Sequence, residues 1–317
     1  MLEVRRSSSC GITNWRRVKK GLLNTASDAL ASKERGVYSS CPQPDGFIVT
    51  QTTPIAILGI SGRMGRTLLT GIENSTDLKL SGGLDSPDSR WVNQDAGSLA
   101  GPMAAGIMIS ADPVIAVRGA KAAIAFALPQ GTPAIVAACA AGKVPLVLGT
   151  TGHNAEQLAA IHEATRHIPI VMASNFSLGV NLLFKLAELA AQALNTDYDA
   201  EVFEAHHRLK KDAPSGTALS IGEAVARGRG TTLDKDAVWA RHGETGARES
   251  GKIGFSVLRG GDIVGDHTLT FAGPGERIEL THRAHDRMAF ASGALHAARW
   301  VIRQQPGLYS MRDVLGL

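Results

Sequence analysis

A short apolar run, a glycine-rich turn and a helix-like segment follow one another at residues 55–72, and this succession restricts the fold most. Ile55–Leu58 has the character of a buried parallel strand, and Thr67–Ile72 has helical apolar spacing. The turn between them, GISGRMG at residues 59–65, has the context of a dinucleotide fingerprint, in which pyrophosphate approaches the glycine backbone and lies on free helix amides. The spacing is GxxGxxG, with Ser61 at the usual second-glycine position, so a plain tight turn is the alternative.

A second strand-like run, residues 78–84, leads directly into Asp85. A carboxylate at this place in a dinucleotide-binding unit accepts hydrogen bonds from the adenine-side ribose. A capping role in a turn is the other interpretation of Asp85.

Further strand, turn and helix units follow along the chain. Strand-like runs at Ala122–Leu128 and Val144–Leu148 flank a helical segment at Ala134–Ala141. Their alternation predicts an α/β fold with a doubly wound parallel sheet, whose ligand lies outside the carboxyl ends of the strands. Gly149–Thr151 and Ala173–Phe176 fall at such ends and are candidate walls on the nicotinamide side, although Thr and Asn are also common capping residues.

The pattern changes after Asn181. A helical segment and a strand at Glu201–His206 come first, and β-like runs at 253–258, 264–271 and 277–282 then follow without intervening helices. This order predicts a second α+β domain built on a mixed sheet. Met288–Val301 is an apolar helix that we expect to pack on the first domain. The expected domains are therefore 54–177, completed by 284–317, for the dinucleotide, and 178–283 for substrate binding and oligomerisation.

The stretch EAHHRLKKDAPSGTAL, residues 204–219, combines a strand end, a cationic loop and a helix start. A helix N-terminus with small residues binds anions, and Arg208, Lys210 and Lys211 add positive charge beside it. Since histidine titrates near neutrality, we interpret the cluster as a site that holds a substrate with more than one carboxylate and protonates it.

Two other interpretations of the same stretch are open. Charge runs are usually solvated, so this segment could be a basic surface loop with one satisfied histidine. A zinc site has little support, because adjacent histidines on a strand point to opposite faces and no Cys, His or Asp partner has metal spacing. We expect no metal.

The first 53 residues differ from the rest in composition. They contain eight of the 33 Lys and Arg and four of the 29 Asp and Glu, which leaves 25 of each sign in the body. A neutral body argues against a nucleic-acid partner. We expect residues 1–53 to be a disordered extension; a start codon assigned too far upstream and an organelle-targeting segment are the alternatives.

Cysteine and hydrophobicity indicate the compartment. Cys10 and Cys41 lie in the extension, and Cys139 alone lies in the body, so neither a disulfide framework nor a cysteine metal site is expected there. The chain also lacks an uninterrupted apolar run of about 18 residues, so no membrane association is expected. Both features suit the cytoplasm.

Together, the GxxGRMGR turn, GTTG at 149–152, ASNFSLGVN at 173–181, the 204–219 stretch and MRDVL at 311–315 resemble the 4-hydroxy-tetrahydrodipicolinate reductases, also called dihydrodipicolinate reductases. The resemblance runs from about residue 54 to the C-terminus. It implies a Rossmann-type cofactor domain, a smaller mixed-sheet domain and a homotetramer. The implied activity is NAD(P)H-dependent reduction of a cyclic imine dicarboxylate in the diaminopimelate route to lysine.

The resemblance also implies roles for individual residues. His206 is expected to be the general acid/base and Lys210 the proton donor. Substrate binding is expected at His207, Gly216 and Thr217. The cofactor is expected to contact Gly59, Ile60, Ser61, Gly62, Arg63, Met64, Asp85, Gly149, Thr150, Thr151, Ala173, Ser174, Asn175 and Phe176.

Two departures from the family pattern affect the cofactor. Ala125-Phe126-Ala127 stands where many members have an acid, Phe and then Ser or Thr, so a hydroxyl contact is absent. Ser86 follows Asp85 where many members have an arginine for a 2′-phosphate. Since Asp85 would repel that phosphate, we expect NADH to be preferred over NADPH.

Two rival functions are weaker. A semialdehyde dehydrogenase, or another dinucleotide-dependent enzyme for imine or carbonyl acids, would fit the fold, but a semialdehyde dehydrogenase needs a nucleophilic cysteine in the second domain. A non-catalytic NAD-sensing protein would have no use for paired histidines and Lys210.

Overall fold

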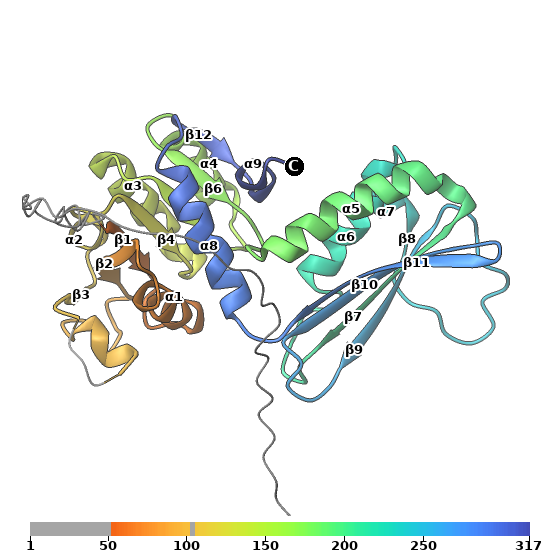
Figure 1. Cartoon of the computed structure of the whole chain (residues 1–317), viewed down its shortest axis with the longest axis horizontal. Coiled ribbons are helices and arrows are strands. Elements are labelled where there is room, and N and C mark those ends of the chain that lie inside the picture. Colours follow the sequence, from red (N-terminus) through yellow and green to blue (C-terminus); the bar gives the residue numbers. More distant parts are fainter. Residues whose placement is uncertain (1–51, 102–104) are drawn as a thin grey trace, which may run out of the picture. The chain divides into compact units, whose positions relative to one another are not determined.

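The computed structural model describes residues 52–101 and 105–317, which form two sheets with their covering helices (Figure 1). The extension expected over residues 1–53 lies outside the described residues, except for its last two positions. Within the described part of the chain, no helix has both the length and the hydrophobicity that a bilayer span requires.

The first sheet has seven strands, all paired in parallel, in the order β12-β6-β5-β4-β1-β2-β3. Neighbours of β1 are β2 on one side and β4 on the other, so the direction of winding reverses there, and the carboxyl ends of β1 and β4 flank the crevice typical of ligand sites. The strands are β1 (Thr53–Leu58), β2 (Leu78–Leu84), β3 (Ile109–Ser110), β4 (Ala122–Ala125), β5 (Leu146–Leu148), β6 (Pro169–Met172) and β12 (Gly307–Tyr309).

Helices cover both faces of this sheet, because its strands are apolar on both sides. Ile55 and Ile57 join the core under α1 (Arg63–Glu73) and α8 (Met288–Val301), with α9 (Met311–Leu315) at its edge. Ala56 and Leu58 face the other core, under α2 (Pro113–Val117), α3 (Thr132–Gly142) and α4 (Ala155–Ala164). The alternation along β1 explains the uninterrupted apolar run in the sequence.

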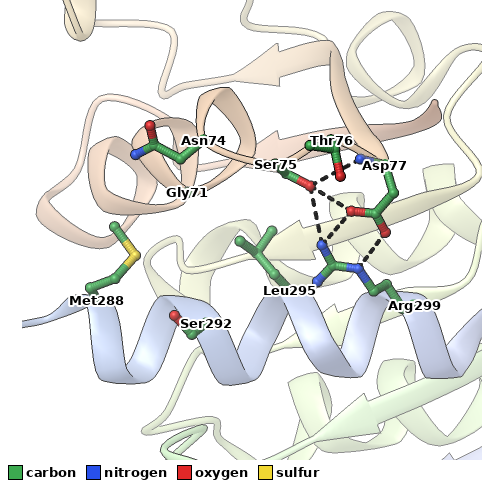
Figure 2. Close-up of a pocket in the computed structure, with 9 residues that line it drawn as sticks. All are labelled: Gly71, Asn74, Ser75, Thr76, Asp77, Met288, Ser292, Leu295 and Arg299. Carbon is green, nitrogen blue, oxygen red and sulfur yellow. Dashed lines mark hydrogen bonds and ion pairs between the residues drawn. The ribbon is translucent and has the colours of Figure 1, made fainter. Parts of the chain in front are cut away.

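An ion pair connects α8 to the loop between α1 and β2 (Figure 2). Arg299 donates to both carboxylate oxygens of Asp77, at 2.6 and 2.8 Å, and to the Ser75 hydroxyl at 3.2 Å. The hydrogen bond from Arg299 holds the pKa of Asp77 well below its usual range. A cavity of about 500 Å³ beside this pair shares no residue with the sites expected from the sequence, so we assign it no functional role.

The second sheet has five strands in the order β11-β10-β7-β9-β8, with both parallel and antiparallel pairs. Its core lies between the sheet and the helices α5 (Leu178–Leu194) and α6 (Gly216–Gly228), with the short α7 (Leu233–Asp236) beside them. The strands are β7 (Asp199–His206), β8 (Ala237–Val238), β9 (Ile253–Arg259), β10 (Gly265–Gly273) and β11 (Glu276–Ala284). The fold class expected from the sequence is therefore confirmed.

Element ends differ slightly from the sequence expectation. The strand expected over 122–128 ends at Ala125, ahead of the 3₁₀ turn that begins at Pro129. The strand expected from Val144 begins at Leu146, directly after Pro145, whose nitrogen cannot donate to a neighbouring strand. The helix expected over Met288–Val301 has those bounds.

Candidate active site

The glycine turn after β1 is packed closely against the end of β4. Gly59 has a φ of 88°, a conformation that favours glycine. A Cβ on Gly59 would lie 2.7 Å from the Phe126 carbonyl oxygen, and one on Gly65 would lie 2.3 Å from the Gly59 carbonyl oxygen. Glycine at these positions lets backbone pack on backbone, which is the role of glycines in a dinucleotide turn.

The helix that follows offers backbone amides to a ligand. Gly62 is the N-cap of α1, and no side chain caps the helix start, so the amides of the first turn are available to an anion. Arg63 is exposed and Ser61 is half-buried, whereas the Ile60 side chain is completely buried. Met64 packs partly against the core. The backbone amides of this turn could therefore hold a pyrophosphate, whereas the buried Ile60 side chain packs in the core.

Asp85 lies directly after β2, in the same cleft as the glycine turn. The cleft encloses about 640 Å³, and its walls include Gly59, Gly62 and Asp85. The Asp85 carboxylate accepts the Ser86 amide at 2.9 Å and the Ser89 hydroxyl at 2.8 Å. Asp85 therefore caps this turn. It also lines the cleft, where ribose hydroxyls could reach its carboxylate.

The ends of β4, β5 and β6 meet around two phenylalanine rings. A Cβ on Gly149 would lie 2.2 Å from the Phe126 ring, and the Thr150 hydroxyl donates to the Ala127 carbonyl at 3.1 Å. The Phe126 ring meets the buried ring of Phe176 edge to face, with centroids 5.7 Å apart. Among the other expected residues, Thr151 and Ser174 are exposed and Ala173 is half-buried.

Asn175 connects the first sheet to the start of α6. Its side-chain oxygen accepts the Ser177 amide at 2.8 Å, which fixes the orientation of the amide group. Its side-chain nitrogen therefore donates to the Thr217 hydroxyl oxygen at 3.0 Å. Within residues 52–101 and 105–317 the Thr217 hydroxyl hydrogen has no acceptor, so it could be donated to a ligand. Asn175, expected at the cofactor, thus orients the hydroxyl of Thr217, expected at the substrate.

A buried carboxylate lies beside His206 at the end of β7. Glu204 is buried, and its Oε2 accepts a short hydrogen bond of 2.5 Å from His206 Nδ1. Arg259 donates to both Glu204 oxygens, at 2.8 and 2.9 Å, and the Ser215 amide donates to Oε1 at 3.0 Å. Burial would raise the pKa of Glu204, but these hydrogen bonds outweigh it and lower the pKa to about 2. Glu204 is therefore an anion in the folded protein.

The start of α6 is organised by Ser215 and a second buried histidine. The Ser215 hydroxyl accepts the Ala218 amide at 3.2 Å, so its hydrogen points to His267 Nε2, 3.1 Å away. Burial and then the nearby His206 lower the pKa of His267 from 6.5 to about 3, which keeps that ring neutral. The amides of Gly216 and Thr217 have no acceptor within the helix, and Gly216 borders open space. An anion can approach these amides.

Lys210 in the cationic loop forms an ion pair. Lys210 donates to the Asp212 carboxylate, with nitrogen-to-oxygen distances of 2.9 and 2.8 Å, whereas Arg208 and Lys211 are exposed. His207 is half-buried, and its Nδ1 has no hydrogen-bond partner within the described ranges 52–101 and 105–317. The solvated-loop interpretation therefore fits Arg208 and Lys211, but not Lys210 or the histidines.

Ligand atoms of Glu204, His206 and His267 lie within 4.8 Å of one another, a spacing that could hold a metal ion. Protein groups already use these atoms: Arg259 and His206 bond Glu204, and the Ser215 hydroxyl bonds His267. A cation would also be repelled by the Arg259 guanidinium beside it. We therefore explain the cluster as a hydrogen-bond network.

Sequence reasoning missed the parts of this network that come from distant strands. Arg259 is paired with His206 across β9 and β7, and His267 is paired with Glu204 across β10 and β7. The spacing of Glu204 and His206, two apart on a strand, places both side chains on one face and was a usable signal. The partners depend on strand pairing, which the local sequence does not reveal.

Comparison with known proteins agrees with this geometry. Residues 53–176 match the family model described as dihydrodipicolinate reductase, N-terminus, and residues 179–315 match dihydrodipicolinate reductase, C-terminus. The chain belongs to the dihydrodipicolinate reductase family. The family assignment expected from the GxxGRMGR and 204–219 motifs is thereby confirmed.

Members of the dihydrodipicolinate reductase family are similar over almost their whole length. A 4-hydroxy-tetrahydrodipicolinate reductase from Nitrosomonas eutropha is 51% identical over 263 residues, 83% of this chain and 98% of the relative. The reductase of the same name from Thiobacillus denitrificans is 52% identical over the same extent. Among solved structures, dipicolinate-bound dihydrodipicolinate reductase from Paenisporosarcina sp. TG-14 has a TM-score of 0.66 at 24% identity, covering 83% of this chain and 99% of that one, and it shares the fold.

Proposed function

We propose that this chain catalyses the NAD(P)H-dependent reduction of 4-hydroxy-tetrahydrodipicolinate to tetrahydrodipicolinate in the diaminopimelate route to lysine. Membership in the dihydrodipicolinate reductase family supports the reaction. The structural observation that supports it most is the Asn175–Thr217 hydrogen bond of 3.0 Å, which joins the cofactor-side strand ends to the anion-binding start of α6. Hydride donor and acceptor must meet at such a junction.

On this proposal, the glycine turn holds the dinucleotide. The backbone of residues 59–64 receives the pyrophosphate, and Asp85 accepts hydrogen bonds from the adenine-side ribose. Gly149–Thr151 and Ala173–Phe176 border the nicotinamide, with Gly149 giving room beside the Phe126 ring. The bound cofactor supplies the hydride.

The second sheet provides the groups that bind substrate and move protons. The amides of Gly216 and Thr217 and the free hydrogen of the Thr217 hydroxyl hold one carboxylate. His207, whose Nδ1 has no partner in the described part of the chain, also contacts substrate. Lys210 donates a proton once a substrate carboxylate displaces Asp212, and His206 acts as the general acid/base at Nε2 while Nδ1 bonds Glu204.

We also propose the arrangement of the working enzyme. Residues 54–177 with 284–317 bind the cofactor, and residues 178–283 bind substrate and form a homotetramer in the cytoplasm. The face of the second sheet opposite α5 and α6 carries Phe203 and Leu258, both 41% exposed. Exposed apolar side chains on a sheet face suit contact with another copy.

The proposal is tested by measuring consumption of reduced nicotinamide with substrate generated in place from pyruvate and aspartate semialdehyde by the synthase. We expect rapid turnover by the wild type and losses of about 10²-fold or more in His206→Ala and Lys210→Ala. Arg208→Ala, a substitution of an exposed cation in the same loop, is the matched control and should retain turnover. A wild type that binds NADH but consumes none in this assay would contradict the proposed function.

Coenzyme preference follows from Asp85 and Ser86. We propose that NADH is preferred, because the carboxylate would repel a 2′-phosphate and Ser86 carries no charge to neutralise it. The ratio of kcat/KM for NADH and NADPH measures this directly. Asp85→Asn should raise relative use of NADPH, and a wild-type ratio clearly in favour of NADPH would refute the preference.

A further inference from the structure

Glu204 is bonded on all sides by groups of the candidate active site. Its Oε2 accepts from His206 Nδ1 and Arg259, and its Oε1 accepts from Arg259 and the Ser215 amide. The Glu204 side chain is 1% exposed, compared with 11% for His206 and 20% for Arg259. A buried carboxylate with two donors on each oxygen is held in one orientation.

Arg259 extends this arrangement to the loop that carries Lys210. One terminal nitrogen donates to the Asp212 carbonyl at 2.7 Å, and the other donates to the Leu258 carbonyl at 2.8 Å. The Asp212 carboxylate in turn accepts a hydrogen bond from Lys210. The Glu204–Arg259 pair therefore contacts His206, the start of α6 and the Lys210 loop at once.

From these contacts we propose that Glu204, held by Arg259, is the positioning residue that fixes the tautomer and orientation of His206. The inference rests on the proposed function, in which His206 exchanges a proton with substrate. Glu204 itself touches no substrate. With the Nδ1 hydrogen committed to Glu204, His206 Nε2 is the only ring nitrogen that can take up a proton.

The surroundings of Nε2 agree with that assignment. Gly265 is the first residue of β10, directly before Asp266, which is paired with Ala205, and a Cβ on Gly265 would lie 3.0 Å from Nε2. The missing side chain leaves that nitrogen uncovered. A ring turned over about its Cβ–Cγ bond would instead place a carbon beside Glu204, and Oε2 would lose one of its two hydrogen bonds.

A neutral amide cannot replace Glu204. Each oxygen of Glu204 accepts two donors, whereas glutamine would present a donating NH₂ group to Arg259, to His206 or to the Ser215 amide. Glu204→Gln should therefore release the His206 ring and lower kcat by about 10- to 100-fold, comparable to loss of partners that orient a catalytic ring. The KM for NADH should stay unchanged, because the cofactor cleft is built from other elements.

A double-mutant cycle separates positioning from general structural support. If Glu204 acts through His206, Glu204→Gln should cost less than about 3-fold in kcat in the His206→Ala background, since effects of residues that act as a unit do not add. Glu201→Gln is the matched control: Glu201 lies on the same strand, also binds an arginine in a bidentate pair with Arg241, and has no contact with His206 among the described residues. It should leave kcat within about 3-fold of wild type. An equal loss from Glu204→Gln in both backgrounds would overturn the proposal.

NMR of the wild type labelled at histidine nitrogens provides a test that does not depend on turnover. At a pH where the ring is neutral, His206 should carry its hydrogen on Nδ1, with its signals assigned by their loss in His206→Ala. In Glu204→Gln both tautomers should appear. Should Glu204→Gln fail to fold, Glu204→Gln with Arg259→Met removes both buried charges together and serves in its place.

The two proposals can fail separately. Absence of turnover in the wild type, with the Nδ1 tautomer observed, would reject the proposed reaction and leave the positioning of His206 intact. Normal turnover with a hydrogen on Nε2 in the neutral wild-type ring would reject the role of Glu204 and retain the reaction.

Discussion

The contact between Gly65 and the glycine turn gives a quantitative test of the cofactor site. A Cβ at position 65 would lie 2.3 Å from the Gly59 carbonyl oxygen and 2.4 Å from that of Ile60. An ordinary contact begins near 3.4 Å, so Gly65→Ala must open the turn by about 1.1 Å. Both obstacles are backbone atoms, which cannot turn aside as a side chain can.

The expected effect is on NADH binding more than on folding. Overpacking of this kind costs about 1–3 kcal/mol, partly offset by the roughly 1 kcal/mol that alanine gains over glycine inside a helix. A displaced helix start should raise the Kd for NADH by about 10- to 100-fold, equivalent to about 1.4–2.8 kcal/mol. Fluorescence titration of NADH measures this without any substrate.

Gly71→Ala is the matched control on the same helix. A Cβ there would meet only movable side-chain atoms, with Leu295 Cδ1 at 2.8 Å and Met288 Sδ at 3.6 Å. Its Kd for NADH should match that of the wild type. A folded Gly65→Ala protein with a Kd within about 3-fold of wild type would refute the assignment of this turn to the pyrophosphate.

Other parts of the structure predict further outcomes. The pKa of His267 is about 3 in the folded protein and 6.5 when unperturbed, so the unfolded chain binds the extra proton between these values. The contribution of the neutral His267 ring to the free energy of unfolding is complete above about pH 6.5, and it falls with decreasing pH at up to about 1.4 kcal/mol per pH unit. His267→Gln should flatten this pH dependence in urea unfolding, and an unchanged slope would contradict the assignment. Arg299→Met should lower stability by less than about 1 kcal/mol, an effect removed by high salt in thermal melts, because the side chains of Arg299 and Asp77 are 39% and 52% exposed. Gly265→Ala should crowd His206 Nε2 and reduce kcat while leaving the Kd for NADH unchanged, as steady-state kinetics with NADH titration can check.

Features specified within a short stretch of sequence could be predicted. The strand and glycine turn at residues 55–65 combine a local apolar pattern with positions where only glycine fits, and the structure places them at the switch in winding direction. Met288–Val301 is apolar enough to identify a buried helix. By contrast, β12 has only three residues, and its existence depends on pairing with β6, about 140 residues earlier in the chain.

The candidate site divides in the same way. His206, Lys210 and Thr217 lie within 12 positions of one another, so their proximity could be read from the sequence. Arg259 and His267 reach the same cluster only through the register of β9 and β10 with β7. The sequence also could not show that Asn175 points its amide nitrogen at Thr217, because that contact depends on how the two sheets are connected.

The return of α8 and β12 to the first sheet affects the order in which the chain can fold on the ribosome. The second sheet ends at Ala284 and can complete its strand pairing while the first sheet still lacks both its edge strand and a helix that covers β4, β5 and β6. Synthesis therefore begins with the cofactor domain and also finishes with it. Until α8 emerges, the apolar side chains that it covers on the first sheet stay exposed, so we expect the nascent chain to bury them only late in synthesis.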